Sequence, residues 1–207
     1  MTSAASLAPA ADESTRSRML SAAVECILEE GYYRASSNRI ARRAGVTWGV
    51  IQYHFGTREQ LLLAVVRQGA EDLVRRLQDA RITGDSVEAR IDSLAGVLWD
   101  HYRRPEFLAH VQVLLNLGKD PRTSEETIRA LADTDRQVGV LLQGLVDDVV
   151  PEELRDGDLG IVLFELMRGA AIGECLLEAL PRSGRRQSVR DTRSPLVRAL
   201  TMLVDGA

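Results

Sequence analysis

Apolar residues recur along most of this chain at intervals of three and four residues, which is the period of an amphipathic helix. The first such run places Leu20, Ala23, Val24 and Ile27 on one face. Glycine, proline and capping residues separate the runs. The pattern predicts an all-α protein of about nine helices, near residues 14–30, 37–44, 47–55, 57–82, 86–102, 107–117, 121–149, 156–180 and 194–204.

Two short helices around a tight turn are predicted over residues 37–56. Gly45 suits the left-handed conformation that ends a helix, and the Thr47 hydroxyl is placed to cap the helix that follows. Val46 and Ile51 have the spacing of a hydrophobic staple around that cap. A helix, a glycine turn and a capped helix at this spacing predict a helix-turn-helix motif.

The second helix of the motif has features of a helix that reads DNA. Such a helix must approach the major groove closely and reach base edges with a few side chains. Gly49 removes bulk from its first half, and the amides of Asn38 and Gln52 can each pair bidentately with adenine. We expect Ile51 and Phe55 to point inward. The side chains expected to point outward are Trp48, Gln52 and Tyr53.

Polar residues beside the motif extend the predicted contact with DNA. Thr57 and Gln60 have capping-box spacing at the start of the next helix. Arg58 lies in the first turn of that helix, where the dipole disfavours a cation, so a shared phosphate would explain it; a solvated arginine is the alternative. Arg16, at the start of the first helix, could reach a phosphate or the minor groove; a solvated helix end is the alternative. The predicted DNA-binding residues are Arg16, Ser36, Ser37, Asn38, Thr47, Trp48, Gly49, Gln52, Tyr53, His54, Thr57 and Arg58.

The charge of the chain is unevenly distributed. The 207 residues carry a net charge of −4, which argues against indiscriminate binding to nucleic acid. Residues 14–60 hold seven arginines and four glutamates, whereas residues 71–207 hold 18 basic and 24 acidic residues. A basic N-terminal segment followed by an acidic remainder fits a protein that touches DNA with one end.

Several other classes of protein find no support in the sequence. Cys26 and Cys175 lie far apart and form no CxxC or metal-ligand spacing, so we expect free buried thiols and no metal or cofactor. No GxSxG, HExxH, P-loop or GxGxxG motif is present, so we do not expect an enzyme. The chain lacks a signal peptide and a long apolar run, which predicts a soluble cytoplasmic protein that does not enter the membrane.

A set of residues at fixed spacing resembles the N-terminal signature of the TetR family of transcriptional regulators. The resemblance covers about residues 14–64 and rests on Gly31-Tyr32, Ile40-Ala41, residues 44–47, Gly49, residues 53–55, Thr57-Arg58 and Leu61-Leu62. The chain departs from that signature at Ala35, Ser36, Arg39 and Gln52. The resemblance implies a homodimer that binds a palindromic double-stranded operator, and an effector that lowers DNA affinity through the helix after the motif.

The resemblance also implies a division into domains. We expect a disordered tail over residues 1–13, a three-helix DNA-binding domain over residues 14–60, and a helical domain for effector binding and dimerisation over residues 61–207. Polar or aromatic residues within apolar helices are candidates for an effector pocket, although each alone is more typical of core packing or of a solvated surface. They are Trp99, Tyr102, Phe107, His110, Asn116, Phe164, Met167 and Arg168, with His101, Gln112 and Glu174 as further candidates.

The last two helices carry more apolar surface than one thin layer of helices can bury, together with small residues that permit close helix approach. We therefore predict a dimer interface, with burial inside the monomer as the alternative. The predicted interface residues are Leu163, Met167, Ala170, Gly173, Leu177, Leu196, Leu200 and Leu203.

These observations favour a ligand-responsive repressor with an unidentified small-molecule effector. One alternative is an effector-independent DNA-binding or architectural protein, which a filled core in the C-terminal domain would favour. Another is a helical small-molecule-binding module without a DNA role, which would leave the basic N-terminal segment and the recognition helix unexplained.

Overall fold

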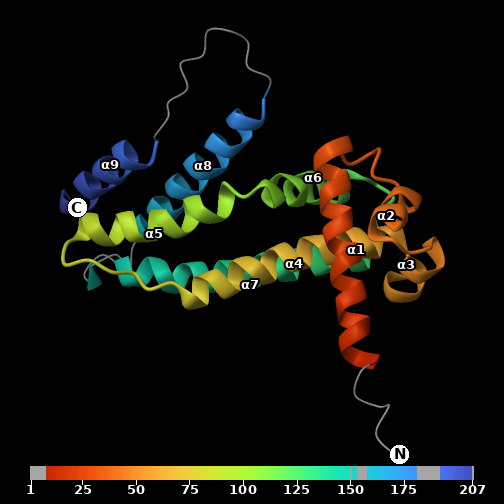
Figure 1. Ribbon diagram of the computed structural model, residues 1–207. Helices are drawn as coiled ribbons and strands as arrows, with labels where there is room; N and C mark the ends of the chain where they lie inside the picture. Colours follow the sequence, from red (N-terminus) through yellow and green to blue (C-terminus); the bar gives the residue numbers. More distant parts are fainter. Residues whose placement is uncertain (1–7, 150, 153–157, 181–191, 207) are drawn as a thin grey trace, which may run out of the picture. The chain divides into compact units, whose positions relative to one another are not determined.

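The computed structural model describes residues 8–149, 151–152, 158–180 and 192–206. Within these residues the chain forms nine α-helices and no strand, which confirms the predicted all-α fold (Figure 1). The helices are α1 (Ala8–Glu30), α2 (Ser37–Ala44), α3 (Trp48–Phe55), α4 (Arg58–Asp79), α5 (Val87–Tyr102), α6 (Pro105–Lys119), α7 (Glu125–Val149), α8 (Leu159–Ala179) and α9 (Arg193–Asp205).

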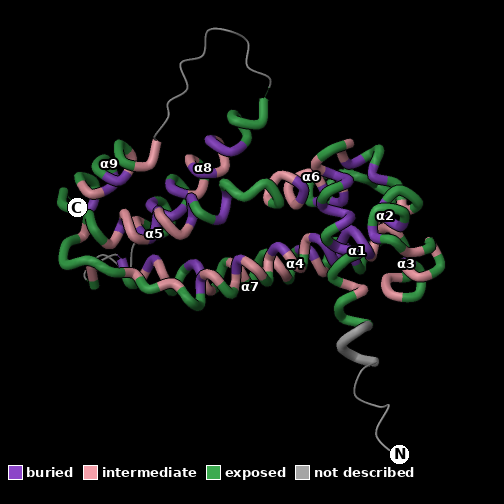
Figure 2. The backbone as a smooth tube through the Cα atoms, viewed as in Figure 1, coloured by how far each residue is buried: buried purple, intermediate pink, exposed green. Residues whose placement is uncertain are grey.

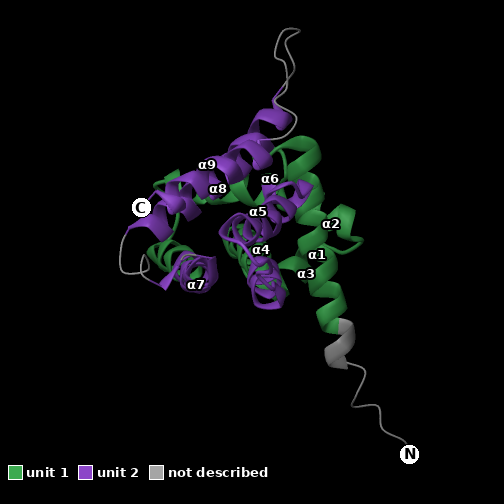
Figure 3. Ribbon diagram, turned by 90° about the vertical axis from the view of Figure 1, so that its left-hand side faces the viewer, with its two compact units in different colours: residues 1–70, 108–134 green, residues 71–107, 135–207 purple. Residues whose placement is uncertain are grey.

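The helices divide between two compact units, which Figure 3 shows in different colours. Unit 1 comprises residues 1–70 and 108–134, and unit 2 comprises residues 71–107 and 135–207. This division differs from the predicted domain boundary after residue 60. The first part of α4, most of α6 and the start of α7 belong with the helix-turn-helix.

The core of unit 1 explains that difference. Helices α1 and α4 carry buried residues along one side (Figure 2). The fully buried side chains of this core include Ile27 of α1, Ile40 of α2, Ile51 of α3, and Leu61 and Leu62 of α4. The same apolar cluster also contains Ala109, Val113 and Leu117 of α6, and Leu131 of α7. Residues 108–134 therefore complete the core on which the helix-turn-helix rests.

Unit 2 has a second, separate apolar core. Helix α5 packs against α8 and α9, and α8 packs against α9. The side chains of Ile91, Leu94 and Leu98 are fully buried on α5. Residues Leu163 and Leu200 bring α8 and α9 into the same cluster. This core lies in the part of the chain for which effector binding and dimerisation were predicted.

The ends of several helices differ from their predicted positions. Helix α1 begins at Ala8 instead of near Ser14, because the segment ahead of Ser14 is rich in alanine and Pro9 falls in the first turn, where proline is tolerated. Of the predicted disordered tail, residues 1–7 lie outside the described residues. The sequence offers Asp85 or Ser86 as the capping residue of α5, and it is Ser86 whose hydroxyl accepts a hydrogen bond from the Ala89 N–H at 3.1 Å.

The sequence predicts Ser194 as the capping residue of the last helix and Pro195 as its first helical residue. Helix α9 begins two residues earlier, with Thr192 at the capping position and Arg193 and Ser194 helical. Most of the loop predicted over residues 182–194 lies outside the described residues. None of the described helices has the length and apolar character that crossing a membrane requires.

The assignment of α6 to unit 1 can be tested with two leucines of that helix. Leu117 is 3% exposed and Leu115 is 57% exposed. Replacing Leu117 with Ala should lower the free energy of unfolding by about 2–5 kcal/mol and speed amide exchange in α1–α3, because it opens a cavity in their shared core. Denaturant unfolding and hydrogen exchange would measure both effects.

Leu115→Ala is the matched control, and it should change neither quantity appreciably. Faster exchange confined to unit 2 in the Leu117 variant would contradict the assignment.

Candidate nucleic-acid interface

The turn of the helix-turn-helix has the predicted geometry. Gly45 follows α2 with φ 68° and ψ 32°, a left-handed conformation that residues with a Cβ rarely adopt. Its N–H donates to the Arg42 carbonyl at 3.2 Å, and the Val46 N–H donates to the Ala41 carbonyl at 2.9 Å. These bonds close the end of α2 and direct the chain into α3.

The first residues of α2 and α3 leave backbone donors available. Ser36 and Thr47 precede the two helices in extended conformations, but neither side chain accepts a capping hydrogen bond. The predicted capping by the Thr47 hydroxyl is therefore wrong, although Thr47 does occupy the capping position. Because the first amides of a helix have no partner within it, both helices present N–H groups that can bind an anion.

The outer face of α3 carries polar side chains that reach solvent. Tyr53 is 83% exposed, and Gln52 and Gly49 are also exposed. Ile51 is buried as predicted. Trp48 is half-buried against the core of unit 1, so the prediction that it points outward holds only in part.

The start of α2 adds further polar groups. Ser36 and Asn38 are exposed and Ser37 is half-buried. Thr57 is exposed as well, and its hydroxyl accepts a hydrogen bond from the Gln60 N–H at 3.1 Å, as its predicted role in capping α4 requires.

His54 is turned toward α1 instead of toward the outer face. Its side chain is only 8% exposed, and its Nε2 lies 3.4 Å from Oδ1 of Asp12. Its neighbour Phe55 is covered by the guanidinium of Arg16, which lies 5.3 Å from the ring centroid. The early start of α1 places Asp12 in this helix and so provides the contact with His54. The predictions that Arg16 and His54 are free to bind DNA are therefore not supported, and sequence patterns gave no sign of the Asp12 contact.

Arg58 is also directed into the protein. Its Nη2 donates to the Tyr32 carbonyl at 2.9 Å and to the Ala35 carbonyl at 3.3 Å, and its guanidinium lies 4.8 Å from the centroid of the Tyr32 ring. These internal contacts differ from the phosphate contact that its place in the first turn of α4 predicted.

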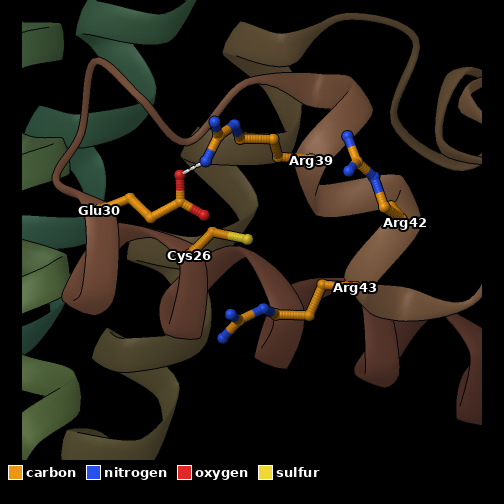
Figure 4. A pocket seen from close by; sticks show the side chains of 5 residues that line it. All are labelled: Cys26, Glu30, Arg39, Arg42 and Arg43. Carbon is orange, nitrogen blue, oxygen red and sulfur yellow. Dashed lines mark ion pairs between the residues drawn. The ribbon is translucent and has the colours of Figure 1, made fainter.

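Figure 4 shows Arg39 of α2 paired with Glu30 of α1, near Arg42, Arg43 and Cys26. Arg39 pairs with Glu30, and Arg43 donates to Glu29 at 2.7 Å. The hydrogen bond from Arg43 lowers the pKa of Glu29. A cavity of about 270 Å³ is lined by Glu30, Arg39 and Arg43 together with Cys26 and Arg42. Two of the seven arginines in residues 14–60 are thus paired with carboxylates of unit 1.

Cys26 itself is 1% exposed, and burial raises the pKa of its thiol. Cys175 is also a free, buried cysteine, as predicted. Among the described residues, no group of three or more His, Cys, Asp or Glu side chains is arranged to hold a metal ion.

The predicted effector-pocket residues divide between the two units. His110 and Asn116 belong to unit 1, where the His110 ring lies so close to Gly69 that a Cβ there would collide with it. The other six belong to unit 2 and are Trp99, Tyr102, Phe107, Phe164, Met167 and Arg168. The structure therefore does not bring all eight residues into one unit.

The six residues of unit 2 mostly contact each other or their close neighbours. The Tyr102 and Phe107 rings meet edge to face with centroids 4.7 Å apart, and burial raises the pKa of Tyr102 to about 12. The Arg168 guanidinium lies 5.4 Å from the Phe164 ring centroid. Met167 is 1% exposed. The residues pack as a core, which is the alternative that the sequence left open for them.

Glu174 is the buried carboxylate of this core. It accepts hydrogen bonds from Trp99 Nε1 at 3.2 Å, from Arg103 Nε at 3.1 Å and from the Thr192 hydroxyl. Burial raises the pKa of Glu174, but these hydrogen bonds outweigh it and hold the pKa below its usual value. A cavity of about 390 Å³ between α5 and α9 is lined by other residues, including Ser86, Asp92 and Arg198.

The predicted dimer residues also fall into two groups. Leu163, Met167 and Leu200 are buried in the core of unit 2, which is the burial inside the monomer that the sequence left open as the alternative. Leu177 is 59% exposed and Leu203 is 51% exposed. Ala170, Gly173 and Leu196 are half-buried. Helical periodicity identified apolar faces but not which of them the chain itself covers.

An exposed apolar stripe nevertheless runs along α8. It consists of the exposed Val162, Leu166, Gly169 and Leu177, the half-buried Gly173, and Leu180 just after the helix, spaced three or four residues apart. Of these, Val162, Leu166, Leu177 and Leu180 are exposed large hydrophobic residues. No atom lies within 4 Å of the position that a Cβ would take at Gly169 or Gly173. The stripe has room for another helix to approach closely.

Comparison with known proteins finds similarity to bacterial transcriptional regulators. The family model described as "Bacterial regulatory proteins, tetR family" matches residues 19–65. The transcriptional repressor AcnR of Corynebacterium glutamicum is 29% identical over 140 residues, which cover 67% of this chain and 70% of AcnR. The transcriptional repressor Rv1474c of Mycobacterium tuberculosis is 26% identical over 168 residues, covering 77% of this chain and 83% of that protein.

Coverage of other relatives is lower, and the match to AcnR of Corynebacterium efficiens spans about half, 53%, of that protein. Among solved structures, the regulator FadR of Bacillus subtilis in complex with stearoyl-CoA superposes with a TM-score of 0.64 at 16% identity, covering 92% of this chain and 98% of FadR. The family model matches the segment that carries the helix-turn-helix, and the structural similarity extends over both units. Residues 19–65 of this chain therefore form a DNA-binding domain of the kind found in the TetR family of bacterial regulatory proteins.

Proposed function

We propose that this protein is a DNA-binding transcriptional regulator that reads a palindromic operator as a homodimer and represses transcription until a small molecule binds. The observation that carries the proposal is the exposed surface formed by α3 and the start of α2. Two uncapped helix starts and several neutral hydrogen-bonding side chains lie on it. The repressors AcnR and Rv1474c, which are related in sequence, support repression as the mode of action.

The DNA contacts that we propose are fewer than the sequence alone predicted. Asn38 and Gln52 are exposed amides that can read adenine, and Tyr53 provides a hydroxyl and an aromatic face. Ser36, Ser37, Thr47 and Thr57, with the free amides of α2 and α3, would hold phosphates. His54 and Arg58 are left out because their side chains bind other parts of unit 1.

The homodimer would form through the exposed stripe of α8, with Met202 and Leu203 of α9. Met202 is 74% exposed, so this apolar side chain has little cover from its own chain. Small residues within the stripe favour close contact between two copies of α8. A two-fold dimer presents one helix-turn-helix to each half of a palindrome.

The proposed binding of an effector is supported by a protein with a similar fold. FadR, which has the same fold, is described in complex with stearoyl-CoA. The internal packing of Trp99, Tyr102 and Glu174 gives some support to a second candidate, a regulator that acts without an effector.

In vitro selection of bound duplexes from a random DNA library, using the full-length protein, would test the proposal without knowledge of the operator. We expect an inverted repeat that binds two chains and resists unrelated competitor DNA at two salt concentrations. Release of the selected duplex would then screen for effectors. Failure to enrich any motif, with equal binding to unrelated DNA, would contradict the function.

Replacing Tyr53 with Ala should weaken binding to the selected duplex by about 1–3 kcal/mol, because an exposed contact to DNA is lost. Titration of both proteins against the same duplex would measure the loss. Leu115→Ala is a control, since Leu115 is 57% exposed in the same unit but lies outside the helix-turn-helix. An unchanged affinity for the Tyr53 variant would remove this residue from the interface.

Replacing Leu177 with Glu should shift the protein toward monomer, because a charge in the centre of a paired apolar stripe would be buried without a partner. Sedimentation velocity over a range of protein concentrations would detect the shift. Val140→Glu places the same charge on α7, where Val140 is 70% exposed, and should leave the dimer intact. A variant at Leu177 that remains fully dimeric would argue for a different interface.

A further inference from the structure

The turn between α1 and α2 is fastened to the first residue of α4. Arg58 donates from Nη2 to the carbonyls of Tyr32 and Ala35, and its Nε lies 3.4 Å from the Ala35 carbonyl. Its guanidinium also stacks on the Tyr32 ring. Tyr32 is 9% exposed and Ala35 is fully buried, so these carbonyls have little access to water. One side chain thus provides partners for two backbone acceptors.

The same turn is held from a second helix. The Tyr32 N–H donates to Oε1 of Gln112 in α6 at 3.3 Å. We call Tyr32, Arg58 and Gln112 the Tyr32 clamp. All three residues belong to unit 1. The clamp joins α4 and α6 to one short turn of the helix-turn-helix.

Hydrogen bonds also attach the first residues of α4 to the start of α7. Glu59 accepts hydrogen bonds from the Ser124 hydroxyl at 2.6 Å and from the Thr127 hydroxyl at 2.5 Å. These bonds lower the pKa of Glu59, which keeps it ionised as an acceptor. Arg58 therefore extends from a helix start that is itself anchored, and it can hold the Tyr32 turn in a defined position.

The position of that turn bears directly on the proposed DNA contacts. Ala35 is followed at once by Ser36, the capping residue of α2, and then by Ser37 and Asn38. A phosphate contact depends on placing such groups to within a fraction of an ångström. We propose that Arg58 is a positioning residue that sets the start of α2 for DNA, with Gln112 as its counterpart in α6. This inference rests on the DNA-binding function proposed above.

The rival interpretation is a direct contact between Arg58 and a DNA phosphate, and the two differ in how they respond to lysine. Lysine keeps the charge but lacks the planar fork that can bridge two carbonyls and stack on a ring. A phosphate contact would survive Arg58→Lys, whereas a positioning role would not. Gln112→Ala tests the clamp from the other side without altering any charge.

The experiment compares Arg58→Lys and Gln112→Ala with the unaltered full-length protein. Arg67→Lys serves as the matched control, because Arg67 is an exposed arginine of the same helix. In the free protein, we expect both clamp variants to speed amide exchange in residues 31–36. On the duplex obtained by selection, we expect each to lose about 3- to 10-fold in affinity, as for one lost hydrogen bond.

The dependence of affinity on salt separates the two interpretations when Arg58→Gln, which removes the charge, is added to the comparison. Loss of a phosphate contact lowers the slope of log affinity against log salt by about 1, whereas loss of positioning leaves the number of phosphate contacts unchanged. We expect the slope for Arg58→Gln to match that of the unaltered protein. Full affinity of Arg58→Lys, or unchanged exchange in residues 31–36, would overturn the positioning role.

Failure of the proposed function is distinguishable from failure of this inference. If selection yields no motif, DNA reading is contradicted and the role of Arg58 in it falls as well, whatever the exchange data show. If a motif is obtained and Arg58→Lys binds it like the unaltered protein, the DNA-binding function stands and only the positioning role is overturned.

Discussion

One shared apolar core governs the N-terminal part of this protein. The helices α2 and α3 have eight residues each, too few to bury a stable core by themselves. Ile40 and Ile51 are fully buried only because α1, α4, α6 and α7 contribute side chains such as Leu61 and Val113 to the same cluster. The helix-turn-helix is therefore one face of a larger unit. Any element that contributes to this core can alter how the recognition helix is presented.

The same packing determines where the charges of unit 1 are used. Arg39 and Arg43 bind glutamates of α1, Arg58 binds backbone carbonyls, and His54 lies against Asp12. The side chains left on the exposed face of α3 are mostly neutral hydrogen-bonding groups. A count of arginines in this segment thus overstates the charge available to phosphates, and backbone amides gain importance in the proposed contact with DNA.

Local signals in the sequence predicted local structure well. Gly45 adopts the left-handed conformation, Thr57 and Ser86 cap their helices, and Ile51 is buried, because each depends on neighbours within a few residues. Contacts between distant segments were not predictable in this way. Helical periodicity marks Leu163 as apolar whether its partner is another helix of the same chain or a second chain. The inward turn of Arg58 depends on carbonyls more than twenty residues away in the sequence, for which the chain carries no local signal.

The division into two units limits how an effector, as proposed, could influence DNA binding. The chain passes from one unit to the other after residues 70, 107 and 134, and each of these points lies within a helix, α4, α6 or α7, and not in a loop. These three helix backbones are covalent routes from unit 2 to unit 1, and a helix transmits displacement more directly than a flexible linker does. The Tyr32 clamp joins two of these helices, through Arg58 and Gln112, to the residues that precede α2. A shift of α4 or of α6 would then move the backbone amides at the start of α2. The start of α2 is therefore where the effects of both helices would combine.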